Sequence, residues 1–274
     1  AHGIQIVLDF FTSILSKQNV QQIQCELEKI ANSSDFESTI ERLQSSFAAA
    51  RIGYEHWRVK QNEWLTQRLS TEGESRSTFG QALHVGSKDV NLVKRSKIWQ
   101  EINEWLSSWG KTQPPFVLLG DEGDGKTWAV ASWLNWQIPK TEDFPPVIFL
   151  SSSHPHSTEP ASLLSETIAR QIGTQDRTYW EKRLQRWLQR PIGQTPVILL
   201  VLDGINERRT PQWWRELIEG LMSSPWRGQI AVLITARTGY WDRYFSILRH
   251  LSVHASILPP YGDTELNAAL KRHQ

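Results

Sequence analysis

The segment that most constrains this chain is Gly120–Thr127, which reads Gly-Asp-Glu-Gly-Asp-Gly-Lys-Thr and fits the pattern G-x-x-x-x-G-K-[ST]. The apolar run Phe116–Leu119 comes directly before it, and a helical pattern over residues 126–136 follows directly after. In a strand–turn–helix unit, the N–H groups of the turn and of the helix start converge on one point, where they stabilise an anion. The sequence therefore predicts an α/β fold with a phosphate-binding loop rather than a glycine-rich turn without a ligand.

Each kind of residue in this loop has a physical role. The glycines permit positive φ angles and let the backbone approach phosphate oxygens closely. Lys126 is placed to reach the β- and γ-phosphates, and the Thr127 hydroxyl is placed to bind Mg²⁺. We expect the three acidic side chains of the loop to point to solvent, because such a loop binds through its backbone. The predicted nucleotide-binding residues are Gly120, Asp121, Glu122, Gly123, Asp124, Gly125, Lys126, Thr127 and Trp128.

The rest of the chain beyond Pro114 alternates between short apolar runs and helical patterns. Such continuous apolar runs are typical of strands that are buried on both faces. Strand–helix alternation favours a parallel sheet covered by helices on both sides. We therefore predict a five-stranded parallel sheet of the P-loop NTPase type. The predicted strands are Phe116–Leu119, Val147–Leu150, Val197–Leu202, Ile230–Thr235 and Ser252–Leu258, and the predicted helices are 96–109, 126–136, 160–172, 177–189, 211–222 and 240–250.

Two acidic residues follow the third predicted strand. Asp203 ends the strand, and a carboxylate at that place beside a phosphate-binding loop can hold Mg²⁺ directly or through water. Glu207 lies four residues further and can orient or deprotonate an attacking water. The alternative roles for Glu207 are a loop cap or an ion pair with Arg208 or Arg209.

A cation follows the fourth predicted strand. Arg237 comes directly after Ala236, at a strand end from which its guanidinium can reach a γ-phosphate. The alternative is a surface arginine. The catalytic set predicted from the sequence is thus Lys126, Asp203, Glu207 and Arg237, with Thr127 and Asp203 as metal ligands.

The first 90 residues have a different pattern from the rest. Residues 4–30 and 36–69 repeat apolar side chains at three- and four-residue steps, which predicts a helical arm or connector over residues 1–70. Residues 71–90 are rich in Gly, Ser, Thr and charge, and we predict a linker or flexible loop there. Residues 91–274 then form the domain that contains the phosphate-binding loop.

Composition excludes several kinds of site. The net charge is +1, which does not favour a nucleic-acid partner, and the single cysteine, Cys25, rules out an intrachain disulfide or a cysteine-based metal site. No apolar run reaches the roughly 18 residues of a membrane span. A cytoplasmic location is expected. The chain begins at Ala1 rather than Met, so we expect it to be a fragment.

Together these motifs resemble the STAND class of signal-transduction NTPases, and in particular its NACHT-type members. The resemblance covers about residues 90–274. Asp203-Gly204-Ile205-Asn206-Glu207 is similar to the family's extended acidic motif, although Asn206 stands where an acid is usual. Ile234-Thr235-Ala236-Arg237 resembles its sensor strand. The asparagine is similar to that of bacterial NLR-like and Avs-like antiphage sensors.

The resemblance implies a molecular switch that binds ATP or ADP with Mg²⁺, hydrolyses ATP slowly and forms a homo-oligomer when activated, in signalling or antiviral defence. It also implies that a protein trigger binds to parts outside this chain, and that helical and winged-helix parts follow Gln274. The segment before residue 96 is similar to the one that flanks the adenine, which places Arg95 near the nucleotide. The alternative for Arg95 is a solvent-exposed arginine.

Two other function classes remain open from the sequence. One is an AAA+-like, DNA-associated ATPase, which shares the phosphate-binding loop and the acidic strand end. It predicts turnover stimulated by DNA. The other is a scaffold whose helical arm does the work and whose nucleotide is structural.

Overall fold

The structure is a computed structural model that describes residues 57, 60–80, 83, 94–110, 113–141, 144–172, 176–189, 195–246, 251 and 253–270. Residues 60–68 are helical, as predicted, and residues 69 and 70 form a turn. Apart from these residues and Trp57, the predicted arm lies outside the described residues. None of the described helices is long and apolar enough to cross a membrane.

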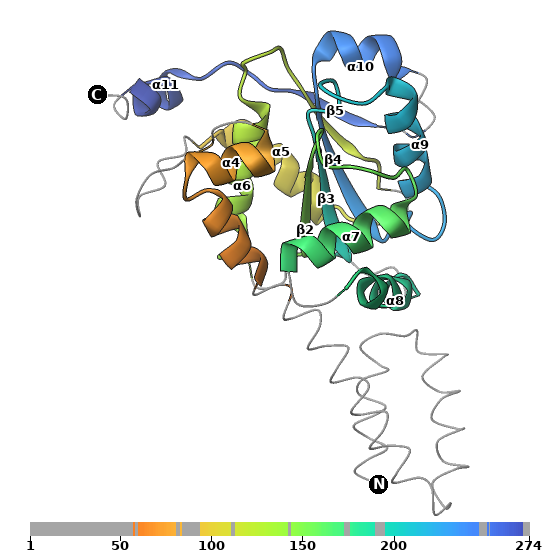
Figure 1. The fold of residues 1–274 in the computed structure, drawn as a ribbon. Coiled ribbons are helices and arrows are strands. Elements are labelled where there is room, and N and C mark those ends of the chain that lie inside the picture. Colours follow the sequence, from red (N-terminus) through yellow and green to blue (C-terminus); the bar gives the residue numbers. More distant parts are fainter. Residues whose placement is uncertain are drawn as a thin grey trace, which may run out of the picture.

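A five-stranded, all-parallel sheet forms the centre of the fold, in the order β2-β3-β4-β1-β5 (Figure 1). Every residue of the first four strands is buried, as their continuous apolar runs predict. The strands are β1 (Phe116–Leu119), β2 (Val147–Ser151), β3 (Ile198–Asp203), β4 (Ile230–Ala236) and β5 (His254–Ile257).

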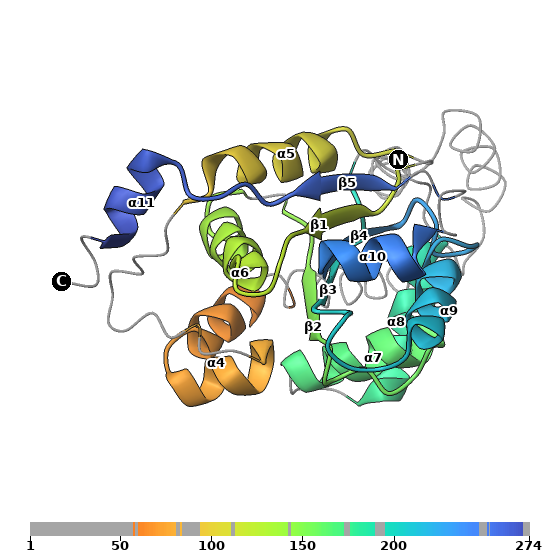
Figure 2. The ribbon, with the colours of Figure 1, turned by 90° about the horizontal axis from the view of Figure 1, so that it is seen from above.

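Helices cover both faces of the sheet (Figure 2). Alternate strand residues face two separate apolar clusters, so that Val117 packs with α7 to α10 and Phe116 packs with α4 to α6. The helices are α4 (Glu72–Phe79), α5 (Ser96–Ser107), α6 (Lys126–Gln137), α7 (Pro160–Ile172), α8 (Arg177–Leu188), α9 (Pro211–Leu221), α10 (Thr238–Tyr244) and α11 (Asp263–Leu270). The predicted fold class is confirmed.

Strand β5 differs from the prediction of strands buried on both faces. It lies at an edge of the sheet, and His254, Ala255 and Ile257 are exposed. An edge strand pairs on one side only, and its side chains lie where the helix layers end.

Helix α4 lies inside the segment that the sequence predicts as a linker, so the expectation of an irregular loop was wrong at residues 72–79. Thr71 is the N-cap of the helix, and its hydroxyl accepts a hydrogen bond from the Glu74 N–H at 3.2 Å. Gly80 ends the helix in the left-handed conformation, with φ at 71°. The domain boundary itself is not tested by this helix.

Candidate nucleotide site

A cavity of about 250 Å³ opens where β1, β3 and β4 end. The three strands pair in register, so that Thr235 lies opposite Leu118 and Ile234 opposite Leu202. The loops that leave these strands therefore meet at one edge of the sheet, where ligands of open α/β sheets bind. The lining residues are Glu122, Gly123, Gly125, Lys126, Thr127, Trp128, Gly204, Asn206, Glu207, Thr235 and Arg237.

The loop after β1 needs glycine at several positions. Gly123 and Gly125 have φ angles of 85° and 83°, in the region that side chains disfavour. A Cβ atom at Gly120 would lie 2.8 Å from a carboxylate oxygen of Asp124. That carboxylate folds back and accepts the Asp121 N–H at 2.5 Å. Asp124 is exposed, as expected, and it also braces the loop through this hydrogen bond.

The start of α6 is arranged to hold an anion. Its N-cap residue is Gly125, which supplies no side-chain hydrogen bond to the first N–H groups of the helix. Such N–H groups and the helix dipole attract a phosphate. The Lys126 ammonium donates to the carbonyl oxygens of Gly120 and Asp121, at 2.9 and 2.6 Å, so it lies across the loop. Burial lowers the pKa of Lys126.

Asp203 is the buried acid of the site, with 3% of its surface exposed. Its carboxylate lies 2.9 and 3.1 Å from the Thr127 hydroxyl, and it accepts a hydrogen bond of 2.7 Å from the Thr235 hydroxyl. The Thr235 oxygen in turn accepts the Gly204 N–H at 2.8 Å. Burial raises the pKa of Asp203 to about 6, although both threonine hydrogen bonds oppose the rise.

This arrangement suits a divalent cation. A hydroxyl and a carboxylate are the oxygen ligands that Mg²⁺ prefers, and a positive ion would offset the buried negative charge. Within the described ranges, no group of three or more His, Cys, Asp or Glu side chains can hold a metal. Thr127 and Asp203 therefore fit an ion that takes its other ligands from water and phosphate, as Mg²⁺ commonly does.

The loop after β3 brings Glu207 to the cavity. The Glu207 N–H donates to the Gly204 carbonyl at 2.9 Å, which closes a tight turn, and its carboxylate accepts the Ser152 hydroxyl at 3.1 Å. The arginine alternatives do not occur in the described structure, where Arg209 donates to the Pro155 carbonyl instead. Glu207 is thus held by its own turn and by Ser152, which directly follows β2.

A hydrogen bond between Asn206 and Arg237 links two loops at the same edge of the sheet. The Asn206 side-chain oxygen accepts the Arg237 N–H at 3.0 Å and so ties the loop after β3 to the end of β4. The Arg237 guanidinium lies 2.9 Å from the Glu122 carboxylate. Arg237 lines the cavity with its charge paired to the phosphate-binding loop, and Glu122 has a partner there rather than pointing only to solvent.

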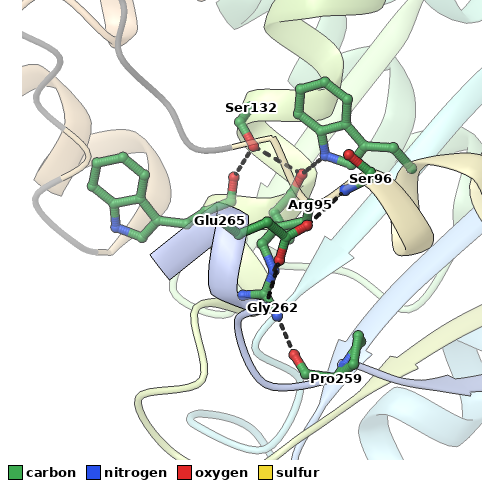
Figure 3. A network of polar contacts seen from close by, with 9 residues as sticks. Arg95, Ser96, Ser132, Pro259, Gly262 and Glu265 are labelled. Carbon is green, nitrogen blue, oxygen red and sulfur yellow. Dashed lines mark hydrogen bonds and ion pairs between the residues drawn. The ribbon is translucent and has the colours of Figure 1, made fainter. Parts of the chain in front are cut away.

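Arg95 is almost fully buried, so the alternative of a solvent-exposed side chain was wrong. Figure 3 shows its guanidinium donating to the Pro259 carbonyl beside Glu265, whose carboxylate also accepts the Ser96 N–H. The guanidinium lies 4.1 Å from the centre of the Tyr261 ring. Arg95 does not line the cavity, and it approaches the loop only through Tyr261, whose hydroxyl would lie 3.9 Å from a Cβ atom at Gly125.

The family model described as "NACHT domain" matches residues 115–259 of this chain, which is more than half of its 274 residues. The chain belongs to the NACHT family. It is therefore a P-loop NTPase, and the loop, Asp203 and Arg237 all fall within the matched part. No curated protein matches it.

Solved structures that resemble this NACHT chain include Cdc6p from Pyrobaculum aerophilum, with a TM-score of 0.45 and 16% identity over 72% of this chain and 52% of that one. The structure of Drosophila ORC bound to DNA gives 0.40 and 15% identity, over 65% of this chain and 44% of that one. The chain therefore spans about half the length of these two solved chains.

Two hydroxyl residues of the NACHT site were missed by sequence reasoning. Thr235 orients Asp203, and Ser152 contacts Glu207. Thr235 lies in β4 beside Asp203 of β3, and Ser152 follows β2 beside the loop that carries Glu207. The strand order and register bring these residues together, and the sequence alone does not reveal either.

Proposed function

We propose that this NACHT protein binds ATP with Mg²⁺, hydrolyses it slowly, and uses the exchange between ATP and ADP to control self-association in signalling or antiviral defence in the cytoplasm. The observation that carries the proposal is the contact of the Thr127 hydroxyl with the buried Asp203, at 2.9 and 3.1 Å, beside the cavity that Thr127, Lys126 and Arg237 line. We propose that residues 91–274 are the NTPase domain and that residues 1–70 form a helical arm or connector.

Five side chains at or beside the cavity have a proposed task. The N–H groups at the start of α6 and Lys126 hold the phosphates, while Thr127 and Asp203 hold the magnesium ion, which supplies positive charge next to the transferred phosphate. Glu207 accepts a proton from the attacking water. Arg237 leaves Glu122 for the γ-phosphate and so distinguishes ATP from ADP.

Binding and turnover by two variants test these tasks. Lys126→Ala is expected to weaken ATP binding by roughly 30-fold or more, because a charged partner of the phosphates is lost. Glu207→Gln is expected to keep binding and to slow hydrolysis by about 100-fold. The matched control is Lys140→Ala, which removes a charge beyond the end of α6 outside the cavity. Tight binding by the Lys126 variant would contradict the assignment.

The switch role needs its own measurement. Light scattering is expected to give larger assemblies for Glu207→Gln with ATP than with ADP, because the variant keeps the γ-phosphate. Equal masses in both nucleotides would exclude nucleotide-controlled assembly of this chain. A DNA titration of the turnover rate tests the AAA+-like alternative, since strong stimulation by DNA would favour it.

A further inference from the structure

The turn after β2 brings a hydroxyl to the acidic end of β3. The two strands are parallel neighbours, and Ser151 pairs with Asp203, so Ser152 lies beside Gly204. Ser152 is buried, with 3% of its surface exposed. Its hydroxyl donates to Oε2 of Glu207 at 3.1 Å, across 55 residues of chain. A buried hydroxyl thus contacts the acid that we assign to water activation.

The Glu207 carboxylate is confined on a second side. Gly204 has a φ angle of 67°, and a Cβ atom there would lie 2.9 Å from Cδ of Glu207 and 3.1 Å from each of its oxygens. The absence of a side chain at Gly204 therefore makes room for this carboxylate. Gly204 fixes where the carboxylate lies, and Ser152 fixes its rotation by holding one oxygen.

The other oxygen is left for the cavity. Among the described residues no hydrogen-bond donor contacts Oε1 of Glu207, while Glu207 lines the cavity together with Lys126 and Thr127. A general base has to lie within hydrogen-bond reach of the water that it activates. Holding one oxygen against β2 keeps the second one available for that water.

We propose that Ser152 is a positioning residue for hydrolysis, which holds Oε2 of Glu207 so that Oε1 accepts the proton of the attacking water. This inference rests on the proposed ATPase function. In the step, the water oxygen bonds to the γ-phosphorus and passes its proton to Glu207. The bond from that phosphorus to the bridging oxygen breaks, and its electron pair stays on ADP. The proton then leaves Glu207 for solvent.

The Ser152→Ala variant should lose turnover but keep its affinity for nucleotides. Its kcat for ATP is expected to fall about tenfold, the lower range for losing a hydrogen bond to a charged group. The Kd values for ATP and ADP should stay within about twofold, because Ser152 does not line the cavity. Ser153→Ala is the matched control, since Ser153 is exposed in the same turn and its hydroxyl contacts Ser151 rather than Glu207.

Two further variants distinguish positioning from a merely structural role. Ser152→Thr keeps the hydroxyl and is expected to recover most of the lost kcat. Adding Ser152→Ala to Glu207→Gln should slow turnover no further, because both changes disable the same group. A multiplied loss, an unchanged or raised kcat in Ser152→Ala, or a folded threonine variant as slow as the alanine variant would overturn the inference.

The same assays separate this inference from the broader proposal. If the unchanged chain hydrolyses ATP and Ser152→Ala matches it, only the positioning role is wrong. If the unchanged chain binds no ATP, or binds it without turnover, the hydrolytic function is wrong and the role of Ser152 is wrong with it.

Discussion

At the scale of single residues, the charged form of Asp203 lowers the stability of the folded chain. A buried carboxylate loses its hydration, and the two threonine hydroxyls near Asp203 offset only part of that loss. Its pKa rises from the ordinary 3.8 to about 6 because of burial. The folded state then binds a proton more tightly than the unfolded chain, so stability falls as the pH rises from about 4 to about 6 and stays low above that.

The first prediction concerns Asp203→Asn in the nucleotide-free chain. The amide keeps the shape and removes the buried charge, so the variant is expected to be more stable at pH 8, by on the order of 3 kcal/mol at most. The gain should vanish below about pH 3, where the carboxyl is protonated in both states. Urea unfolding at several pH values measures it, with the exposed Asp242→Asn as control. A gain that does not change with pH would contradict the assigned cause.

The second prediction concerns Asn206, which stands where the family usually has an acid. Its oxygen accepts the Arg237 N–H, and an aspartate oxygen can do the same. Asn206→Asp is therefore expected to keep turnover within about threefold. Asn206→Ala, which removes the acceptor, should lower the preference for ATP over ADP about fivefold, the effect of one ordinary hydrogen bond. An ATPase assay measures the turnover and competition binding measures the preference, and an equal loss of preference for ATP in the two variants would argue against this tie.

The sequence predicts those site residues that belong to a motif. Lys126 and Thr127 line the cavity and Asp203 contacts Thr127 beside it, as expected from the positions of these residues relative to the strand ends along the chain. Thr235 escapes prediction because a hydroxyl in an apolar run also fits simple packing, and Ser152 escapes it because it stands between two other serines. The burial of Arg95 also cannot be predicted from the sequence, because its partner Glu265 lies 170 residues away along the chain.

At the scale of elements, the sequence predicts the central strands more closely than the edges. Each of β1 to β4 starts or ends within about one residue of its predicted bounds, because a continuous apolar run marks a strand buried on both sides. Helix α10 ends at Tyr244, six residues before the predicted end. Helix α4 was missed because its residues are polar, although Thr71 and Glu74 form a capping pair.

The third prediction concerns the start of α4. Thr71→Ala removes the acceptor of the Glu74 N–H and is expected to lower the free energy of unfolding by about 1 kcal/mol. Thr71→Ser keeps the hydroxyl and should cost much less. Urea unfolding of the three proteins checks this. A serine variant as unstable as the alanine variant would show that the methyl group, not the cap, stabilises this end.

At the scale of the whole molecule, nucleotide binding depends on the folded sheet. The residues that meet the phosphates and the cation leave β1, β3 and β4, which are paired neighbours in the middle of the sheet. Losing that pairing would separate Thr127 from Asp203. A ligand that joins these loops therefore binds the folded state only, and it stabilises the whole sheet by mass action.

The last prediction combines this coupling with the charge of Asp203. ADP with Mg²⁺, at 100 times its Kd, is expected to stabilise the folded chain by about 2.7 kcal/mol. The part that depends on Mg²⁺ should shrink as the pH falls through 6, because a protonated Asp203 gives the ion no charge. Thermal unfolding with ADP and either Mg²⁺ or EDTA, at pH 5 and pH 8, measures the stabilisation that depends on Mg²⁺.

The Asp203→Asn variant is the control for this last prediction. Its difference in stability between Mg²⁺ and EDTA should be small at both pH values. A difference as large as in the unchanged chain would mean that the ion is held by other groups.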